Sequence, residues 1–201
     1  MKLFSGRLLA AAAALLAVPA FASAAITLNI GSTTLSESAG VQNFTLDVRF
    51  TNDGASSPMV GYDVALQITG GSGLTITGMG TSGNGNLITN PVIASFPTFG
   101  TSGSLYLFSD ASGSPGSIDN NDGLFRILLQ AAGGTTGAFQ ISFFQSVSDP
   151  LDTKIYTDFS ANEVPITSFN AGTVTINAIP EPAAMSLALF ALPLLARRRV
   201  R

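Results

Sequence analysis

Three oxygen-bearing side chains that lie close together in the sequence, Asp119, Asn121 and Asp122, are the ones best suited to chemistry. Carboxylate and amide oxygens at short spacing are the ligands that Ca²⁺ prefers. The segment is not an EF-hand loop, because counting back from Gly123 puts Ile118 at the first ligand position. The other interpretation is an Asx-rich turn that leads into a strand. We favour the turn, so that no cofactor is expected and calcium at these three residues is the alternative.

The chain has no histidine and no cysteine. Nucleophile–base pairs built on these residues are therefore excluded, as are thiolate metal sites and disulfide bonds. A serine–lysine pair would need Lys154, the only lysine after Lys2, and no Ser-x-x-Lys motif precedes it. Pairs of carboxylates occur in any acidic chain and give no specific sign of glycoside hydrolysis. We predict that the protein is not an enzyme, and a secreted hydrolase is the least favoured alternative.

Acidic side chains dominate the middle of the chain. Between Ala25 and Ile179 there are eleven acids and three bases, Arg49, Arg126 and Lys154, which gives a formal net charge of −8. So acidic a segment is unsuited to phosphate backbones, and we expect no nucleic-acid partner. Its length is sufficient for one domain with a hydrophobic core.

Hydrophobic and polar residues alternate in this segment over several short windows: 44–51, 62–69, 74–77, 139–143 and 173–176. A period of two places one face of a strand on a core and the other in water. Windows 105–108 and 124–129 are apolar on both faces and predict central strands. Together with the intervening Gly-, Asn- and Pro-containing turns, they predict an all-β fold, a single antiparallel β-sandwich of about nine strands. The Ser/Gly-rich stretches 78–86 and 109–117 are predicted to be surface loops.

The first 24 residues have the organisation of a secretory signal peptide. Lys2 and Arg7 precede an apolar stretch at 8–18, and Ala22 and Ala24 form an A-x-A cleavage site. We predict a signal helix that is recognised by the Sec export machinery and cleaved after Ala24. An uncleaved N-terminal anchor is the alternative.

Residues 179–201 contain three elements in order. Pro180, Glu181 and Pro182 come first, and an uncharged stretch at 183–196 follows. The chain then ends with an arginine cluster, namely Arg197, Arg198, Arg199 and Arg201. As a helix the uncharged stretch would rise about 21 Å, less than the roughly 30 Å of a bilayer core, and the arginines would stay on the cytoplasmic side. We expect a short hydrophobic helix that enters the membrane at least transiently, with an ordinary tail anchor as the alternative.

This order of elements resembles the PEP-CTERM sorting signal of Gram-negative and related bacteria. The resemblance implies that Pro180, Glu181 and Pro182 are recognised by an exosortase, a membrane protease that processes such proteins during export. It also implies a location in the cell envelope, at the cell surface or outside the cell.

The segment 25–178 resembles a cohesin-type domain, a jelly-roll sandwich of the carbohydrate-binding-module superfold. The residues that carry the resemblance are Ile26–Ile30, Phe44–Asn52, Val60–Leu66, Asp122–Ile127 and Gly172–Ile176. A generic immunoglobulin-like or Calx-β-like sandwich is the alternative, because residues 35–40 are similar to a Calx-β opening. Cohesins of cellulosomes bind dockerins, but their interface residues are not recognisable in this sequence.

These observations favour a non-catalytic cell-surface or extracellular-matrix protein that is associated with exopolysaccharide. The alternative is a cohesin-like or carbohydrate-binding module with a protein or polysaccharide partner. Sugar binding usually needs an exposed aromatic ring. The chain lacks tryptophan, and Tyr62 falls on an inward register, so Tyr106 and Tyr156 are the candidates, with packing at a sheet edge as the alternative for both.

Overall fold

Segments in which hydrophobic and polar residues alternate form strands along most of the described chain. The computed structural model describes residues 25–54, 56–81, 84, 87–146 and 152–179. Every window that was predicted as a strand lies within a strand. The described residues form β1 (Ile26–Ile30), β2 (Thr33–Ser36), β3 (Gln42–Asn52), β4 (Ser57–Thr69), β5 (Leu74–Met79), β6 (Thr98–Ser102), β7 (Leu105–Ile118), β8 (Gly123–Ala131), β9 (Gly137–Phe143), β10 (Lys154–Tyr156), β11 (Ile166–Asn170) and β12 (Gly172–Asn177).

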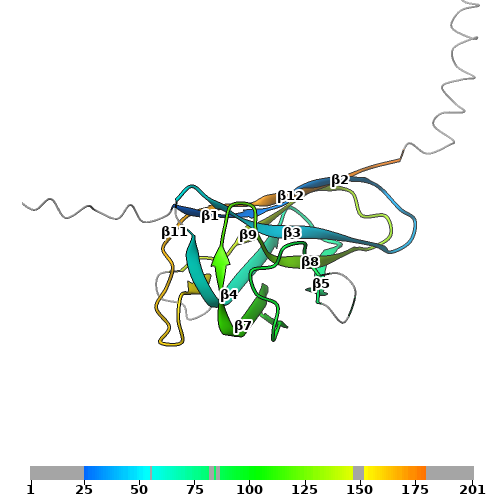
Figure 1. Ribbon diagram of the computed structural model, residues 1–201. Coiled ribbons are helices and arrows are strands. Elements are labelled where there is room, and N and C mark those ends of the chain that lie inside the picture. Colours follow the sequence, from blue (N-terminus) through cyan, green and yellow to red (C-terminus); the bar gives the residue numbers. More distant parts are fainter. Residues whose placement is uncertain (1–24, 55, 82–83, 85–86, 147–151, 180–201) are drawn as a thin grey trace, which may run out of the picture.

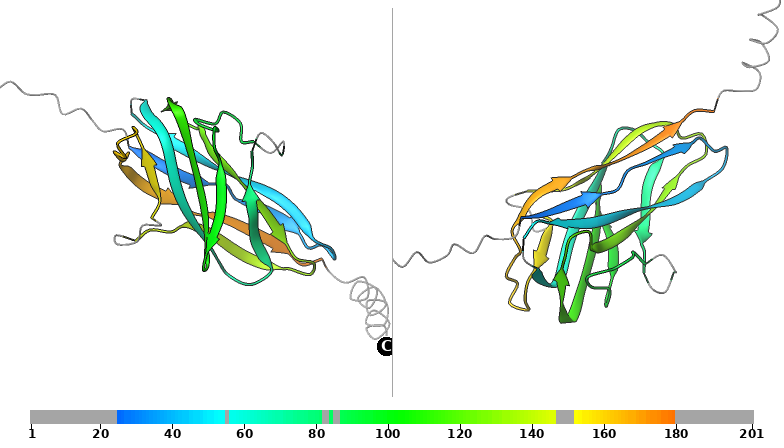
Figure 2. Two further views of the ribbon diagram at one scale, coloured as in Figure 1. Left: turned by 90° about the horizontal axis from the view of Figure 1, so that it is seen from below. Right: turned by 45° about the horizontal axis from the view of Figure 1, so that its top comes forward.

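The strands form two sheets that pack face to face (Figures 1 and 2). The five-stranded sheet has the order β11-β1-β3-β8-β5, and the seven-stranded sheet has the order β2-β12-β9-β4-β7-β6, with β10 paired to β4. The all-β sandwich is therefore confirmed. The prediction of about nine strands in a purely antiparallel arrangement is wrong, because the described residues form twelve, and β1–β11 and β12–β2 pair in parallel.

Two of the extra strands arise because two neighbouring segments pass from one sheet to the other at the same place. β1 lies in the five-stranded sheet and β2 in the seven-stranded sheet, and β11 and β12 make the same change. The two backbones touch at this crossing, since a Cβ added to Gly172 would collide with the carbonyl oxygen of Gly31 and the side chain of Ile30. Each pair of short strands is thus one segment interrupted at a bend.

Inward-facing side chains from both sheets form one hydrophobic core. At its centre the ring of Phe125 stacks on Tyr62, with ring centroids 5.6 Å apart, and on Phe108, at 4.5 Å. The Tyr62 side chain is buried, which confirms its inward register, and its hydroxyl donates to Met79 Sδ at 3.6 Å. Burial of each such large side chain contributes about 1.5–3 kcal/mol.

The Ser/Gly-rich stretch 109–117 is not a loop, contrary to the prediction. It forms the second half of β7, which pairs with β4 from Ser57↔Ile118 to Met59↔Gly116 and, after a bulge, from Gly61↔Ala111 onward. A glycine is required at position 116 because the chain at Val92 crosses close to β7, and a Cβ at Gly116 would meet the Val92 carbonyl oxygen. Close packing thus explains this one glycine, whereas Gly113 has open space around it.

The described chain begins and ends at opposite ends of the sandwich (Figure 2). At one end the Ala25 N–H donates to Asp53 Oδ1 at 2.9 Å. At the other end the Ile179 N–H donates to Glu37 Oε2 at 3.2 Å. Each end of the described chain is therefore hydrogen-bonded to a neighbouring loop.

Candidate functional site: an aromatic recess

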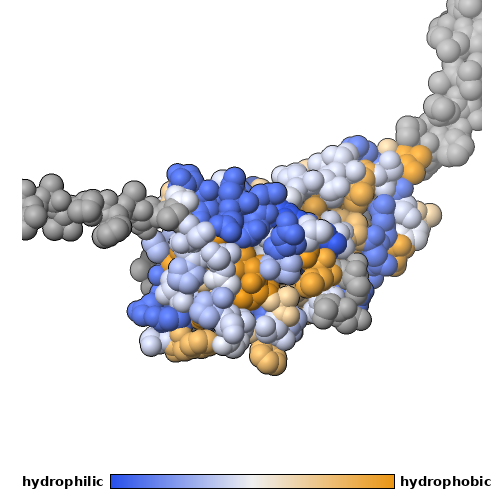
Figure 3. Space-filling view, in the orientation of Figure 1, coloured by the Kyte–Doolittle hydropathy of each residue, from blue (hydrophilic) through white to orange (hydrophobic). Residues whose placement is uncertain are grey.

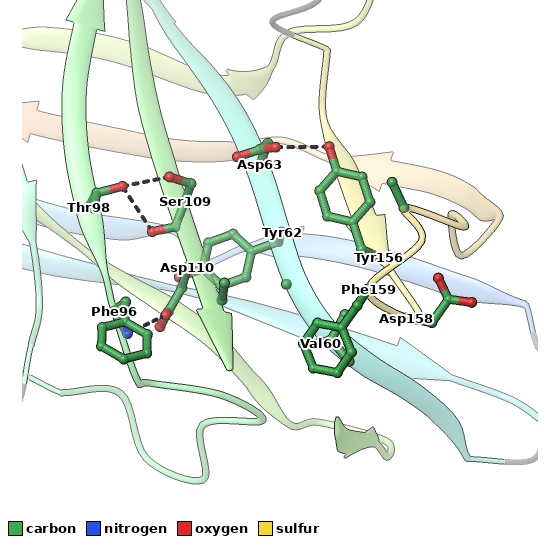
Figure 4. A pocket seen from close by; sticks show the side chains of 13 residues that line it. Val60, Tyr62, Asp63, Phe96, Thr98, Ser109, Asp110, Tyr156, Asp158 and Phe159 are labelled. Carbon is green, nitrogen blue, oxygen red and sulfur yellow. Dashed lines mark hydrogen bonds between the residues drawn. The ribbon is translucent and has the colours of Figure 1, made fainter. Parts of the chain in front are cut away.

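A recess of about 340 Å³ lies over β4 and β7, between the segment before β6 and the loop after β10 (Figure 4). We call it the aromatic recess. The residues that line it are Val60, Gly61, Tyr62, Asp63, Phe96, Thr98, Ser109, Asp110, Ala111, Tyr156, Asp158, Phe159 and Ala161.

Small residues on two paired strands make room for the recess. Gly61 of β4 and Ala111 of β7 are register partners, next to the bulge of this pair. A Cβ at Gly61 would lie 3.1 Å from the carbonyl oxygen of Asp110, so even an alanine there would require the backbone to move. The hydroxyls of Thr98 and Ser109 hydrogen-bond to each other at 2.6 Å and form one wall (Figure 4).

Two phenylalanines flank the recess and expose most of their surface. Phe96, before β6, is 71% exposed, and Phe159, after β10, is 72% exposed. They lie on opposite sides of the recess (Figure 4). By contrast, the surface over β1 and β3 is hydrophilic (Figure 3). Exposed large apolar side chains of this kind, gathered at a hollow, are typical of binding sites.

The position of Phe96 is fixed by a buried carboxylate. Asp110 is 5% exposed, and its Oδ1 accepts the Phe96 N–H at 2.7 Å. Burial raises the pKa of Asp110 above its ordinary value, and the backbone N–H groups of Phe96, Ala111 and Ser95 offset part of this effect. Asp110 therefore orders the segment that carries Phe96.

The opposite wall is held by Tyr156 and Asp158. The Tyr156 hydroxyl donates to Asp63 Oδ2 at 2.8 Å, and burial together with this bond raises the pKa of Tyr156 to about 12. Asp158 accepts the N–H groups of Ser160 and Asn162, and its hydrogen bonds with Asn162 lower its pKa. The loop that carries Phe159 is thus closed by its own side chains.

The recess is equipped for binding. Among the described residues that line it, Asp63 and Asp158 are accessible acids and none is basic. Ser109 and Thr98 hydrogen-bond to each other. An arrangement of this kind can hold an apolar group and a positive charge.

The residues of the calcium alternative form a hydrogen-bonded turn. Asp122 Oδ2 accepts the Asp119 N–H at 2.7 Å, and Asp119 Oδ1 accepts the Ser56 hydroxyl. Asn121 has a positive φ of 68°, and its carbonyl accepts from Arg49 at 3.0 Å. No group of three or more acidic, histidine or cysteine side chains that could hold a metal is found in the part of the chain described. This geometry matches the Asx-turn interpretation, and calcium binding stays the untested alternative.

The two tyrosines considered for sugar binding lie apart. Tyr156 lines the recess, whereas the hydroxyl of Tyr106 lies 3.2 Å from Thr75 Oγ1 of the other sheet. Tyr106 is thus engaged between the two sheets. Phe96 and Phe159 were not predicted; they stand in irregular segments, Phe96 between Ser95 and Pro97 and Phe159 between Asp158 and Ser160.

The predicted sorting residues lie outside the described residues. These are Ala22 and Ala24 at the signal cleavage site, Pro180, Glu181, Pro182, Arg197, Arg198 and Arg199 in the tail, and the predicted helices of both ends. Within the described ranges no helix is long and apolar enough to span a membrane.

Comparisons with solved structures identify the fold. The chain is similar to the seventh ScaB type I cohesin of Pseudobacteroides cellulosolvens, with a TM-score of 0.53, 15% identity, and 79% of this chain and 96% of that chain covered. The sandwich has the cohesin fold. A non-cellulosomal cohesin of Archaeoglobus fulgidus matches with a TM-score of 0.50, 13% identity, and coverage of 81% and 96%. The OlpC cohesin of Clostridium thermocellum matches with a TM-score of 0.54, 11% identity, and coverage of 77% and 95%.

Comparisons of the sequence do not assign the chain to a family. No protein-family model matches the chain, and no curated protein matches it either. At these identities the solved structures establish the cohesin-like fold alone, and the function has to be argued from the site.

Proposed function

We propose that the sandwich is a non-catalytic module of an exported protein and that it binds a protein partner through the aromatic recess. The observation that carries the proposal is the pair of exposed rings, Phe96 and Phe159, on either side of the hollow over β4 and β7. Aromatic side chains that are held in place before binding are typical anchors of protein interfaces.

The cohesin-like fold supports the same proposal. The OlpC cohesin of Clostridium thermocellum was determined in a cohesin–dockerin complex, so a sandwich of this fold serves to bind a protein. The Archaeoglobus fulgidus relative in fold is a non-cellulosomal cohesin, which supports a use outside cellulosomes. A protein partner is therefore favoured over our first expectation of a cell-surface or extracellular-matrix protein associated with exopolysaccharide.

Export and sorting are the second part of the proposal. The signal peptide with Ala22 and Ala24 would direct the chain to the Sec machinery, and the PEP-CTERM-like tail would deliver it to an exosortase. The sandwich would then act in the envelope, at the cell surface or in an exopolysaccharide matrix. We expect deletion of residues 197–201 to leave precursor unprocessed or misrouted, as measured by mass spectrometry of both chain ends. Unchanged processing and location would contradict the sorting proposal.

Binding is tested by capture followed by reconstitution. The full chain, fixed to a support, is exposed to envelope proteins of the source cells, and the captured protein is purified and titrated by calorimetry. We expect a micromolar or tighter complex that the double variant Phe96→Ser/Phe159→Ser loses. Val41→Ser serves as the matched control, because Val41 is 60% exposed outside the recess. Equal binding by the double variant, or capture of polysaccharide alone, would contradict the proposal.

A further inference from the structure

The aromatic recess has a chemistry that specifies its occupant. Resting on the proposed function, we infer that the recess receives a polypeptide segment of the partner in which a hydrophobic side chain stands next to a lysine or arginine. The hydrophobic side chain lies between Phe96 and Phe159, and the cation lies at Asp63 and Asp158.

The hydrophobic part of the inference follows from the shape of the recess. Gly61 and Ala111, which are register partners, line it without a large side chain and so leave the hollow open. The two exposed rings stand on opposite sides of it (Figure 4). A hydrophobic side chain inserted between them would remove apolar surface of the protein and of the partner from water.

The cationic part follows from the distribution of charge. Each of the three basic residues between Ala25 and Ile179 forms an ion pair: Arg49 and Arg126 with Asp47, and Lys154 with Glu163. In the described part of the chain, no basic side chain lines the recess, while Asp63 and Asp158 do. The pKa of Asp158 is lowered by its hydrogen bonds with Asn162, so this carboxylate is charged at neutral pH. Neither Asp63 nor Asp158 forms an ion pair in the described part of the chain; Lys154, the register partner of Asp63, interacts with it electrostatically but is bound to Glu163. A cation of the partner thus meets two carboxylates that no basic side chain contacts directly.

A neutral glycan fits the same recess less well. Sugar rings stack on a continuous aromatic platform, but Phe96 and Phe159 come from different segments and lie across the hollow from each other. The hydroxyl of Tyr156, which could serve a sugar, donates to Asp63. The separated rings and the two carboxylates without a direct ion pair favour a peptide over a polysaccharide.

Three synthetic peptides of equal length test the inference against the full chain by calorimetry. The first carries Leu and Lys in a Gly/Ser background, the second has Glu in place of Lys, and the third has Ser in place of Leu. We expect the Leu/Lys peptide to bind at least about tenfold more tightly than either of the others. Raising NaCl from about 0.05 M to about 0.5 M should weaken this binding severalfold, because salt screens the charge pairing.

Substitutions in the recess test whether the Leu/Lys peptide binds there. Asp63→Asn and Phe159→Ser should each reduce affinity for the Leu/Lys peptide severalfold or more. Glu37→Gln and Val41→Ser, near the opposite end of the sandwich, should leave it unchanged. Equal affinity for all three peptides, or equal losses in the control variants, would overturn the inference.

These measurements distinguish failure of the inference about the peptide from failure of the proposed function. If the captured partner binds through Phe96 and Phe159 while the Leu/Lys peptide shows no preference, the inference fails and the proposed function stands. If soluble dextran or laminarin binds and the recess variants lose it while no peptide binds, both fail.

Discussion

A single carboxylate organises the polar face of the five-stranded sheet. Asp47 accepts from Arg126 Nε at 2.6 Å and Nη2 at 3.1 Å, and from Arg49 Nη2 at 3.0 Å. Burial would raise the pKa of Asp47, but the hydrogen bonds and charges of the two arginines outweigh it and hold the pKa below its ordinary value. Arg49 also donates to Thr89 and to the carbonyl of Asn121, so this cluster ties β3 to two loops.

The lowered pKa of Asp47 predicts a pH-dependent contribution to stability. Because the folded-state pKa lies below the unfolded value, the contribution is present above about pH 4 and is lost as the pH falls through the folded-state pKa. We expect Asp47→Asn to lower the free energy of unfolding by about 1 kcal/mol at neutral pH, the usual scale for a partly exposed ion pair. Urea unfolding of the wild type and the variant at a series of pH values measures this difference in the free energy of unfolding. A difference that is independent of pH would contradict this account.

A substitution at Asp122 distinguishes the Asx turn from the alternative of a calcium site. Removal of the bond from the Asp119 N–H to Asp122 Oδ2 in Asp122→Ala should lower the free energy of unfolding by about 1 kcal/mol. The loss should be the same with calcium and with EDTA, as measured by thermal unfolding. A wild-type melting temperature that falls with EDTA, together with an Asp122→Ala effect seen only with calcium, would support the metal site.

The candidate site could be predicted only in part from its residues. The absence of histidine and cysteine excluded the common forms of catalysis, and alternation correctly turned Tyr62 inward. Tyr156 was considered a sugar-binding residue and lies in the recess. Phe96 and Phe159 were missed because they stand in irregular segments, where no periodicity relates them to each other or to β4. The long-range pairing of β4 with both β7 and β10 brings their segments together.

At the scale of elements, strands with at least one buried face were largely predictable from hydrophobic pattern, and an exposed edge strand was not. β3, β9 and β12 alternate because one side meets the core. β6 was missed because all of its residues are exposed at the edge of its sheet, which leaves no alternation to detect. β7 was cut short because its Ser/Gly half indicated a loop.

The crossing at Gly172 provides a test of the architecture. Gly172→Ala should destabilise the protein by about 1–3 kcal/mol, because the added methyl group meets the backbone of Gly31 and the side chain of Ile30. Gly113→Ala in β7 is the matched control, since a Cβ there has no neighbour within 4 Å. Chemical denaturation of both variants gives the comparison. Equal stabilities would show that the two segments do not touch at the crossing.

At the scale of the whole molecule, the aromatic recess lies toward the end of the sandwich where the described chain begins. Gly61 stands near the start of β4, which follows the Asn52 end of β3, and β3 pairs there with Ile26. Ile179 lies at the opposite end, beside Glu37. If the tail holds the protein at a membrane as proposed, the recess points away from it toward the surroundings. This orientation suits a module that captures a partner from outside.

Photo-crosslinking in the source cells tests the central claim most directly. A photoreactive amino acid is placed at position 159, at position 96 or, as the control, at position 41 of the full chain, and the adducts are identified by mass spectrometry. The account predicts one and the same protein partner at 159 and 96, none at 41, and a cross-linked chain that has been exported and lacks residues 1–24. Adducts with polysaccharide only, the same adducts at all three positions, or a cytosolic chain that retains its first residues would contradict it.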